Sequence, residues 1–122
     1  MEQSRKDNNP ILKMTFEFSL AIIEYCEKLE EKRKYNIANQ LFRSGTSIGA
    51  NSYEAQNAES KADFIHKFKI AAKEMYETHY WLMLCKESKS YPDTSKLISR
   101  LDEISKVITK IISTSKTYNK KD

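Results

Sequence analysis

Glycine and proline are scarce in this chain of 122 residues, since each occurs only twice. Average usage would give about nine glycines and six prolines in a chain of this length. Hairpins, β-sandwiches and dinucleotide-binding loops all need such turn residues at many positions. The chain therefore has few turns, and we expect a single all-α domain made of a few long helices.

Long apolar runs, cysteine motifs and targeting segments are also missing. No window reaches the roughly 18 apolar residues of a membrane span, and the polar start, MEQSRKDNNP, does not resemble a signal peptide. The two cysteines, Cys26 and Cys85, lie far apart with no CxxC motif. Such cysteines are typical of buried thiols in a reducing compartment. We therefore expect a cytoplasmic protein without a membrane partner.

Charged residues are abundant but unevenly placed. They make up 31% of the chain against 39% hydrophobic residues, which is too apolar a composition for a disordered protein. The formal net charge is +4, yet residues 10–31 carry −3 whereas residues 32–57 and 90–122 carry +3 each. This asymmetry favours a basic patch and an anionic partner.

Apolar residues recur at helical spacing along four separate segments. We predict helices over about residues 10–31, 36–58, 60–88 and 93–117. Helices of this length joined by short loops lie antiparallel to their neighbours, so we expect an up-down-up-down antiparallel four-helix bundle. The bundle is predicted to occupy residues 10–117, between a flexible N-terminus (1–9) and a basic flexible tail (118–122).

The first predicted helix carries a wide apolar stripe. Ile11, Phe18 and Ile22 recur at helical spacing, and Leu12 and Phe16 widen the stripe. We expect these side chains to face the core. The outer face of the same helix is acidic, with Glu17, Glu24, Glu27, Glu30 and Glu31.

The third predicted helix is apolar on two sides. Ile70, Trp81 and Leu84 lie away from the stripe that we assign to the core. A helix that is apolar on two sides is buried on two sides, whereas a four-helix monomer leaves one side to water. We therefore predict a homo-oligomer with Ile70, Tyr80, Trp81 and Leu84 in the subunit interface.

Residue arrangements typical of a catalytic or metal site are missing. A di-metal bundle needs Glu-x-x-His on two helices, and the chain has no such motif. His66 and His79 lie 13 residues apart on one predicted helix, too far apart to share a metal. No histidine follows an arginine within six positions, which removes the Arg-x(4–6)-His pair of some helical ribonucleases. We expect no enzymatic activity, no metal and no cofactor.

The segment 40–57 places polar residues where a buried helix usually has apolar ones. Ser44 and Asn51 lie in the predicted core stripe. Gly45 and Gly49 lie inside the same helix, where each costs about 1 kcal/mol relative to alanine. Such a helix must satisfy its polar groups across a close contact with a neighbour.

Polar side chains on the third predicted helix are candidate partners for that segment. Glu74, Glu77 and His79 all lie there. We favour an internal hydrogen-bond network that fixes the register of the bundle. A ligand or RNA contact by Arg43 and Ser47 is the functional alternative.

Aromatic and basic side chains give two further candidate surfaces. Tyr76, Tyr80 and Trp81 are of a type that stacks on nucleic-acid bases, although we favour a place in the core and a subunit interface for them. The basic residues of the last two helices are either a solvated face or a phosphate-binding surface. The candidate nucleic-acid contacts are Lys67, Lys69, Lys73, Lys96, Arg100, Lys106 and Lys110.

Three motifs in the middle of the chain carry a family resemblance. They are Gln40-Leu-x-Arg-Ser-x-x-Ser-Ile48-x-x-Asn51-x-x-Glu54, Ser60-x-x-Asp-Phe-Ile65 and Glu74-x-x-Glu77-Thr-x-x-Trp-Leu82. With them the chain resembles the 23S rRNA intervening sequence proteins, also called the four-helix bundle protein family. It is also similar to the accessory variability determinants of diversity-generating retroelements. The resemblance is close over the second and third helices, and extends to the outer two in pattern only.

The resemblance implies a bacterial four-helix bundle that assembles as a homopentamer and binds RNA, DNA or a reverse transcriptase through a basic surface. Most members have no established activity. The family motif maps onto Arg43, Ser44, Ser47, Asn51 and Glu54, with Glu74 and Glu77 on the next helix, and we interpret these residues as a structural polar network.

Two positions depart from the family pattern. Phe42 stands where members often have a second arginine, which argues against phosphate contact by this strip, and Ala38 replaces a serine or threonine. The leading hypothesis is a non-enzymatic oligomer that binds nucleic acid or a nucleic-acid enzyme. The alternative is a protein-interaction scaffold that binds no nucleic acid.

Overall fold

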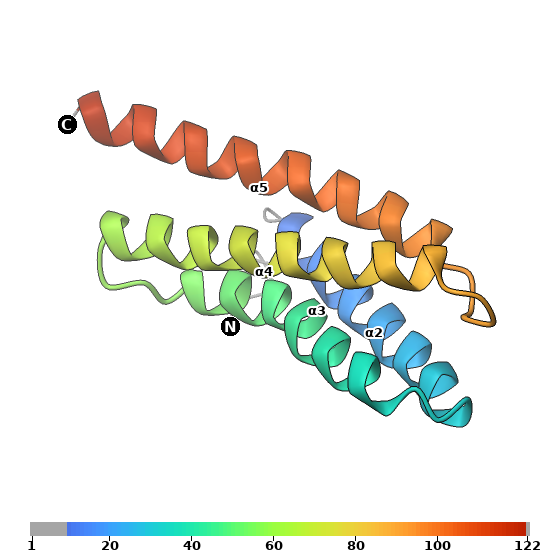
Figure 1. The fold of residues 1–122 in the computed structure, drawn as a ribbon. Coiled ribbons are helices and arrows are strands. Elements are labelled where there is room, and N and C mark those ends of the chain that lie inside the picture. Colours follow the sequence, from blue (N-terminus) through green and yellow to red (C-terminus); the bar gives the residue numbers. More distant parts are fainter. Residues whose placement is uncertain (1–9, 122) are drawn as a thin grey trace.

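The computed structural model describes residues 10–121, with side chains described as far as Lys116, and this part of the chain consists of four helices (Figure 1). The helices are α2 (Pro10–Glu31), α3 (Tyr35–Ala55), α4 (Lys61–Glu87) and α5 (Ser95–Lys121). No strand occurs among the described residues. The prediction of an all-α fold with four helices is confirmed.

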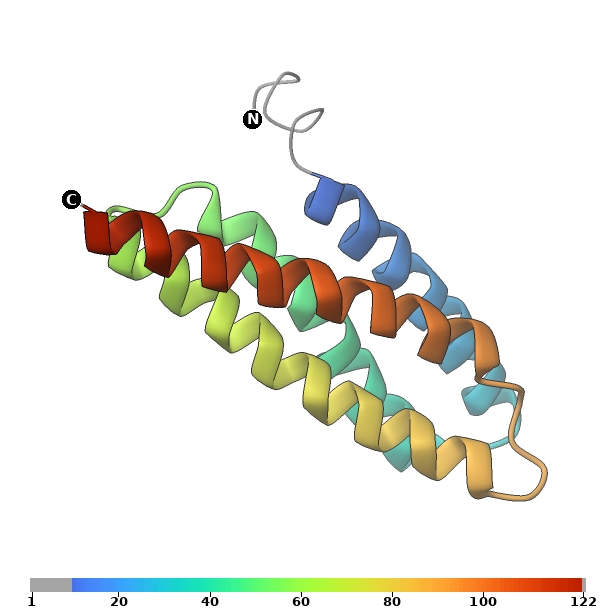
Figure 2. The ribbon, with the colours of Figure 1, turned by 90° about the horizontal axis from the view of Figure 1, so that it is seen from above.

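The helices surround one core. Each helix contacts the next one along the chain, and α5 also contacts α2. No Cα atom of α2 lies within 8 Å of one in α4, and the same holds for α3 and α5, so these pairs lie on diagonals. The connecting loops lie at alternating ends of the helices (Figures 1 and 2).

A close contact joins α2 and α3 because both glycines of α3 face α2. A Cβ atom on Gly45 would lie 2.9 Å from Cγ1 of Ile22, and one on Gly49 would lie 3.2 Å from the carbonyl oxygen of Thr15. Any larger residue would force the helices apart or displace these atoms. The two glycines therefore serve helix packing and no turn.

The turn between α2 and α3 is made without glycine. Arg33 takes a left-handed conformation with φ of 62°. The amide of Lys34 donates to the carbonyl of Leu29 at 2.8 Å, and that of Arg33 donates to Glu30 at 2.9 Å. This pair of bonds is the Schellman arrangement, whose left-handed position usually holds glycine. The scarcity of glycine thus places an arginine in a strained conformation.

Both ends of α2 match the predicted boundaries, and the ends of the other three helices differ from them by one to four residues. Ser60 caps α4 by accepting a hydrogen bond from the amide of Asp63 at 3.0 Å, so the helix begins at Lys61. The carboxylate of Asp93 accepts hydrogen bonds from the amide and hydroxyl of Ser95, where α5 begins.

The last helix extends beyond its predicted end. It continues to Lys121, because no glycine or proline follows Pro92, so the backbone of 118–121 is helical where we predicted a flexible tail. Residues 1–9 and Asp122 lie outside the described residues.

Most predicted core positions of α2 are buried, but Phe16 is not. Ile11, Phe18 and Ile22 are at most 1% exposed, whereas 65% of Phe16 is exposed. Each helical residue turns the side chain by about 100°, so Phe16 lies about 200° from Phe18 and points outward. The expectation that Phe16 widens the core stripe was wrong.

Candidate nucleic-acid interface

A continuous row of exposed side chains runs along the outer face of α4. Steps of three and four residues keep these positions on one side of the helix, opposite the buried Ala71 and Leu82. We call this row the outer line of α4, and it consists of Ala62, His66, Lys69, Lys73, Tyr76, Tyr80 and Leu84. It contains no carboxylate.

Two tyrosines stand out on the outer line. Tyr76 is 74% exposed and Tyr80 is 59% exposed, and neither hydroxyl has a hydrogen-bond partner in the described part of the chain. The ring of Tyr80 packs edge-to-face against Trp81, with 5.4 Å between centroids. Core packing therefore accounts for Trp81, which is half-buried, but not for the two tyrosines.

The candidate basic residues fall into two groups. Lys67 forms a salt bridge with Glu54 on α3, with 3.1 Å between Nζ and Oε1, so its charge is neutralised locally. The other six are exposed and form no salt bridge within residues 10–116. They are Lys69 and Lys73 on α4 and Lys96, Arg100, Lys106 and Lys110 on the neighbouring α5. Asp102 and Glu103 interrupt the α5 group.

Arg43 is held between two carboxylates at the seam of α3 and α4. Its Nη1 lies 3.2 Å from Oε1 of Glu74, and its Nη2 pairs with Oε2 of Glu77, which also accepts a hydrogen bond from Nε1 of Trp81 at 3.1 Å. The hydrogen bond from Arg43, and then that from Trp81, holds the pKa of Glu77 below its ordinary value. The two acids neutralise Arg43, which argues against the predicted alternative of a phosphate contact.

One buried bond crosses the same seam. Oγ1 of Thr78 and Oγ of Ser44 lie 2.9 Å apart and share a hydrogen bond, and both residues are 0% exposed. His79, which we expected to be a partner, is exposed. Thr78 was missed, although it lies three residues after Met75 and four before Leu82, at core spacing.

The remaining motif residues of α3 bond within their own helix. The Ser47 hydroxyl donates to the carbonyl of Arg43 at 2.6 Å, and the Asn51 amide donates to the carbonyl of Ser47 at 2.9 Å. Asn51 is half-buried. The network that crosses to α4 therefore consists of Arg43 and Ser44, with Glu54 reaching Lys67, and excludes Ser47 and Asn51.

The predicted subunit interface is divided between two places. Ile70 and Trp81 are half-buried, with Trp81 packed against the core at the seam of α3 and α4. Tyr80 and Leu84 lie on the outer line, where Leu84 is 40% exposed. The second apolar side of α4 is thus covered in part by α3, while the rest faces outward.

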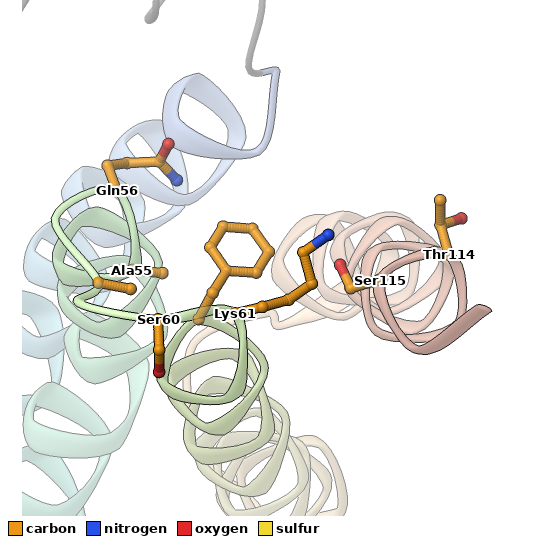
Figure 3. Close-up of a pocket in the computed structure, with 8 residues that line it drawn as sticks. Ala55, Gln56, Ser60, Lys61, Thr114 and Ser115 are labelled. Atoms are coloured by element: carbon orange, nitrogen blue, oxygen red, sulfur yellow. The ribbon is translucent and has the colours of Figure 1, made fainter. Parts of the chain in front are cut away.

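A cavity of about 480 Å³ lies at the end of the bundle where α4 begins (Figure 3). Phe64 is among its lining residues, and Lys61, Thr114 and Ser115 lie around it. The lining residues include no histidine, cysteine or carboxylate. The polar groups that line it are the hydroxyls of Ser60, Thr114 and Ser115, the amine of Lys61 and the amide of Gln56.

Among the residues that the structure describes, no three His, Cys, Asp or Glu side chains are grouped so that they could hold a metal ion. None of the described helices combines the length and apolar character needed to cross a membrane.

Comparison with known proteins decides the family. The family model of the 23S rRNA-intervening sequence protein matches residues 7–110. The chain belongs to this family. The family resemblance that the sequence motifs indicated is confirmed, and the family name links the chain to intervening sequences of rRNA.

A solved structure supports the assignment. It is a protein of unknown function from the S23 ribosomal protein family of Bacteroides thetaiotaomicron VPI-5482, 37% identical to this chain with a TM-score of 0.79. The match covers 84% of this chain and 97% of that one. No curated protein matches the chain.

Proposed function

We propose that this family member is a non-enzymatic, up-down-up-down antiparallel four-helix bundle of the bacterial cytoplasm. In this proposal it binds nucleic acid, RNA in particular, through the basic side chains of α4 and α5. The observation that carries the proposal is the set of six exposed basic side chains on these two neighbouring helices, none of which forms a salt bridge within the described chain.

The distribution of charge supports binding through the side of the bundle that α4 forms. The exposed glutamates of α2, including Glu24 and Glu27, lie on the helix diagonal to α4. The acidic side chains of α2 and the basic ones of α4 are therefore separated across the bundle, whereas α5, which carries the other four basic residues, adjoins α2. A nucleic acid that approaches α4 meets attraction, whereas α2 repels it.

Oligomer formation is the second part of the proposal. Several large apolar side chains are exposed on α2 and α3, and they are Phe16, Leu20, Phe42 and Tyr53. Soluble monomers rarely expose many such groups close together. We propose that a second copy covers them, in a homopentamer as the family resemblance implies. Light scattering that gives the mass of one 14.3 kDa chain at micromolar concentration would contradict this part.

The binding test uses a labelled RNA and a salt series. We expect a steep loss of affinity as salt rises, because each lysine–phosphate contact contributes about −0.7 to −0.9 to the slope of log K against log salt. The triple variant Lys69→Gln, Lys106→Gln, Lys110→Gln should bind more weakly, with a slope smaller by about 2. The matched control is Lys13→Gln, Lys28→Gln, Lys32→Gln, which removes the same charge from exposed positions on or next to α2.

Equal effects of the two triple variants would count against a specific basic surface. No mobility shift with RNA or DNA even at about 50 mM salt would sink the nucleic-acid part altogether. The alternative function, a protein scaffold, is favoured by the exposed apolar side chains of α2 and α3. A protein partner that stays bound after nuclease treatment, combined with no shift, would support it.

A further inference from the structure

Packing within the chain does not explain why Tyr76 and Tyr80 face outward on α4. They are 74% and 59% exposed. They lie four residues apart on the outer line, so about 6 Å separates them along the helix axis. Both rings are thus presented to solvent side by side.

We infer that the outer line of α4 binds single-stranded nucleic acid, with Tyr76 and Tyr80 each stacking on one base and Lys69 and Lys73 contacting the adjoining phosphates. This inference rests on the proposed function and narrows it to one class of nucleic acid. In this inference the two tyrosines recognise bases, whereas the basic side chains of α5 make only electrostatic contacts with the nucleic acid.

The spacing of the rings selects a single strand over a duplex. Bases in a duplex are about 3.4 Å apart and cover one another's faces. Two rings about 6 Å apart along a helix fit between bases only when those bases have been unstacked and splayed. Loops and unpaired strands offer such bases, and base–aromatic stacking is tolerant of sequence.

The charge on the same line supports an anionic occupant. Lys73 precedes Tyr76 by three residues and Lys69 precedes Lys73 by four, so both lysines lie on the tyrosine side of the helix. No carboxylate lies on the outer line, and Glu77, four residues after Lys73, is already paired with Arg43, although the charge of Lys73 also helps to lower the pKa of that carboxylate. Both lysines therefore keep their charge for phosphate.

Trp81 acts as a positioning residue for the second ring. Its Nε1 donates to Oε2 of Glu77 at 3.1 Å, which fixes the indole. The ring of Tyr80 then packs edge-to-face on that indole with an interplanar angle of 63°. A ring that is already oriented loses less conformational entropy when a base stacks on it.

The test compares fluorescence anisotropy of a labelled single strand with that of a duplex of the same length. In the double variant Tyr76→Ala, Tyr80→Ala we expect the single strand to bind at least about 30-fold more weakly, because each of the two stacked rings contributes at least about fivefold in affinity. The salt slope and the duplex affinity should stay unchanged. The matched control is Tyr35→Ala, which removes a tyrosine of α3 that is 54% exposed and lies outside both the outer line and the proposed subunit contact.

An oligonucleotide with abasic sites gives an independent readout. Wild-type protein should bind it as weakly as the Tyr76→Ala, Tyr80→Ala variant binds the intact strand, since stacking is lost in both cases. Conversely, Lys69→Gln with Lys73→Gln should reduce the salt slope by about 1.4, with the preference for single strands retained.

Three outcomes would overturn the inference. One is a single-strand affinity of the tyrosine variant within twofold of wild type, and another is wild-type binding that does not distinguish single strand from duplex. In both of these the protein still binds nucleic acid, so the proposed function stands. The third is a fall in oligomer mass in the tyrosine variant, which would make the outer line a subunit contact. If wild type binds neither strand nor duplex, the proposed function fails as well.

Discussion

Ser44 on α3 and Thr78 on α4 join their hydroxyl groups inside the core, with 2.9 Å between the two oxygens. Neither residue has any exposed surface. Oγ1 of Thr78 also lies 2.8 Å from the carbonyl oxygen of Glu74, one turn earlier in the same helix. The pair therefore satisfies two buried polar groups at one point of contact and fixes the register of the two helices.

Replacing Thr78 by valine should test that pair. The variant keeps the shape but leaves the Ser44 hydroxyl buried without its partner, so we expect the free energy of unfolding to fall by about 1–3 kcal/mol. Urea denaturation measures the change. The double variant Ser44→Ala, Thr78→Val should lose less than the sum of the single variants, and strictly additive losses would show that the two hydroxyls are not coupled.

Gly45→Ala should destabilise the protein although alanine is the better helix former. The added Cβ atom would lie 2.9 Å from Cγ1 of Ile22 and 3.0 Å from two further atoms of that side chain. Overpacking costs about 1–3 kcal/mol, against about 1 kcal/mol gained in helix propensity. In an Ile22→Ala background the same substitution should become neutral or stabilising in urea denaturation. An equal loss in both backgrounds would contradict this explanation.

Arg33→Gly should stabilise the protein. Arg33 is exposed with φ of 62°, a conformation that costs a residue with a side chain about 1–2 kcal/mol. Glycine removes this strain but has greater freedom in the unfolded chain, so we expect a net gain of about 0.5 kcal/mol in thermal or urea denaturation. Lys32→Gly, one residue earlier at a position without positive φ, is the control and should lose stability.

Periodicity and glycine content were enough to predict four helices. In the last helix Leu97, Leu101, Ile104 and Ile108 recur at helical spacing and are buried, because an apolar stripe along one side of a helix packs against the core. The glycines of the same α3 segment lie where that helix packs closely on α2. The exposed side of α4 was harder to predict, since apolar Trp81 packs on the core while Tyr76 faces solvent.

Side-chain pairings between helices were predicted less well than the helices themselves. A rotation of about 100° per residue separates buried Thr78 from exposed His79, and composition does not distinguish them. Lys67 and Lys69 looked alike in the sequence, yet only Lys67 lies opposite an acid, Glu54 on α3. Such pairings depend on the register between helices, which one sequence does not specify.

Both cysteines should be unreactive in the folded protein. Burial, followed by the charge of Glu30, raises the pKa of the Cys26 thiol to about 12, and burial raises the pKa of Cys85. A thiol reagent at about pH 8 should therefore modify neither until denaturant is added. They also form no disulfide, because no Cα atoms of α2 and α4 lie within 8 Å and a disulfide needs about 4.4–6.8 Å.

The raised pKa of Cys26 makes the free energy of unfolding depend on pH in the alkaline range. The unfolded chain loses the Cys26 proton near pH 9 whereas the folded protein keeps it to about pH 12, so the free energy of unfolding falls as pH rises through this window. Cys26→Ala should show a shallower alkaline decline than wild type. Rapid labelling of the native protein, or identical alkaline slopes, would contradict the burial of an uncharged thiol.

The pairing of Arg43 with Glu77 should contribute stability that disappears in acid. Arg43 lowers the folded pKa of Glu77, so the folded carboxylate holds its proton less tightly than the unfolded one. The stabilisation is therefore present above the ordinary pKa of glutamate, about 4.3, and is lost as pH falls through the lower folded value. Because the groups are partly exposed, Arg43→Gln should cost about 1 kcal/mol or less at neutral pH.

Urea denaturation of wild type and Arg43→Gln at neutral and acidic pH measures this difference. We expect the gap to close in strong acid and to shrink at high salt, because protonation removes the charge of Glu77 and ions screen the exposed pair. The control is Lys69→Gln, which removes a cation that forms no salt bridge with the described residues. The difference in stability between this variant and wild type should be small and nearly the same at both pH values. A gap that persists unchanged in acid would mean that Arg43 acts through packing of its aliphatic stem and not through its carboxylate partners.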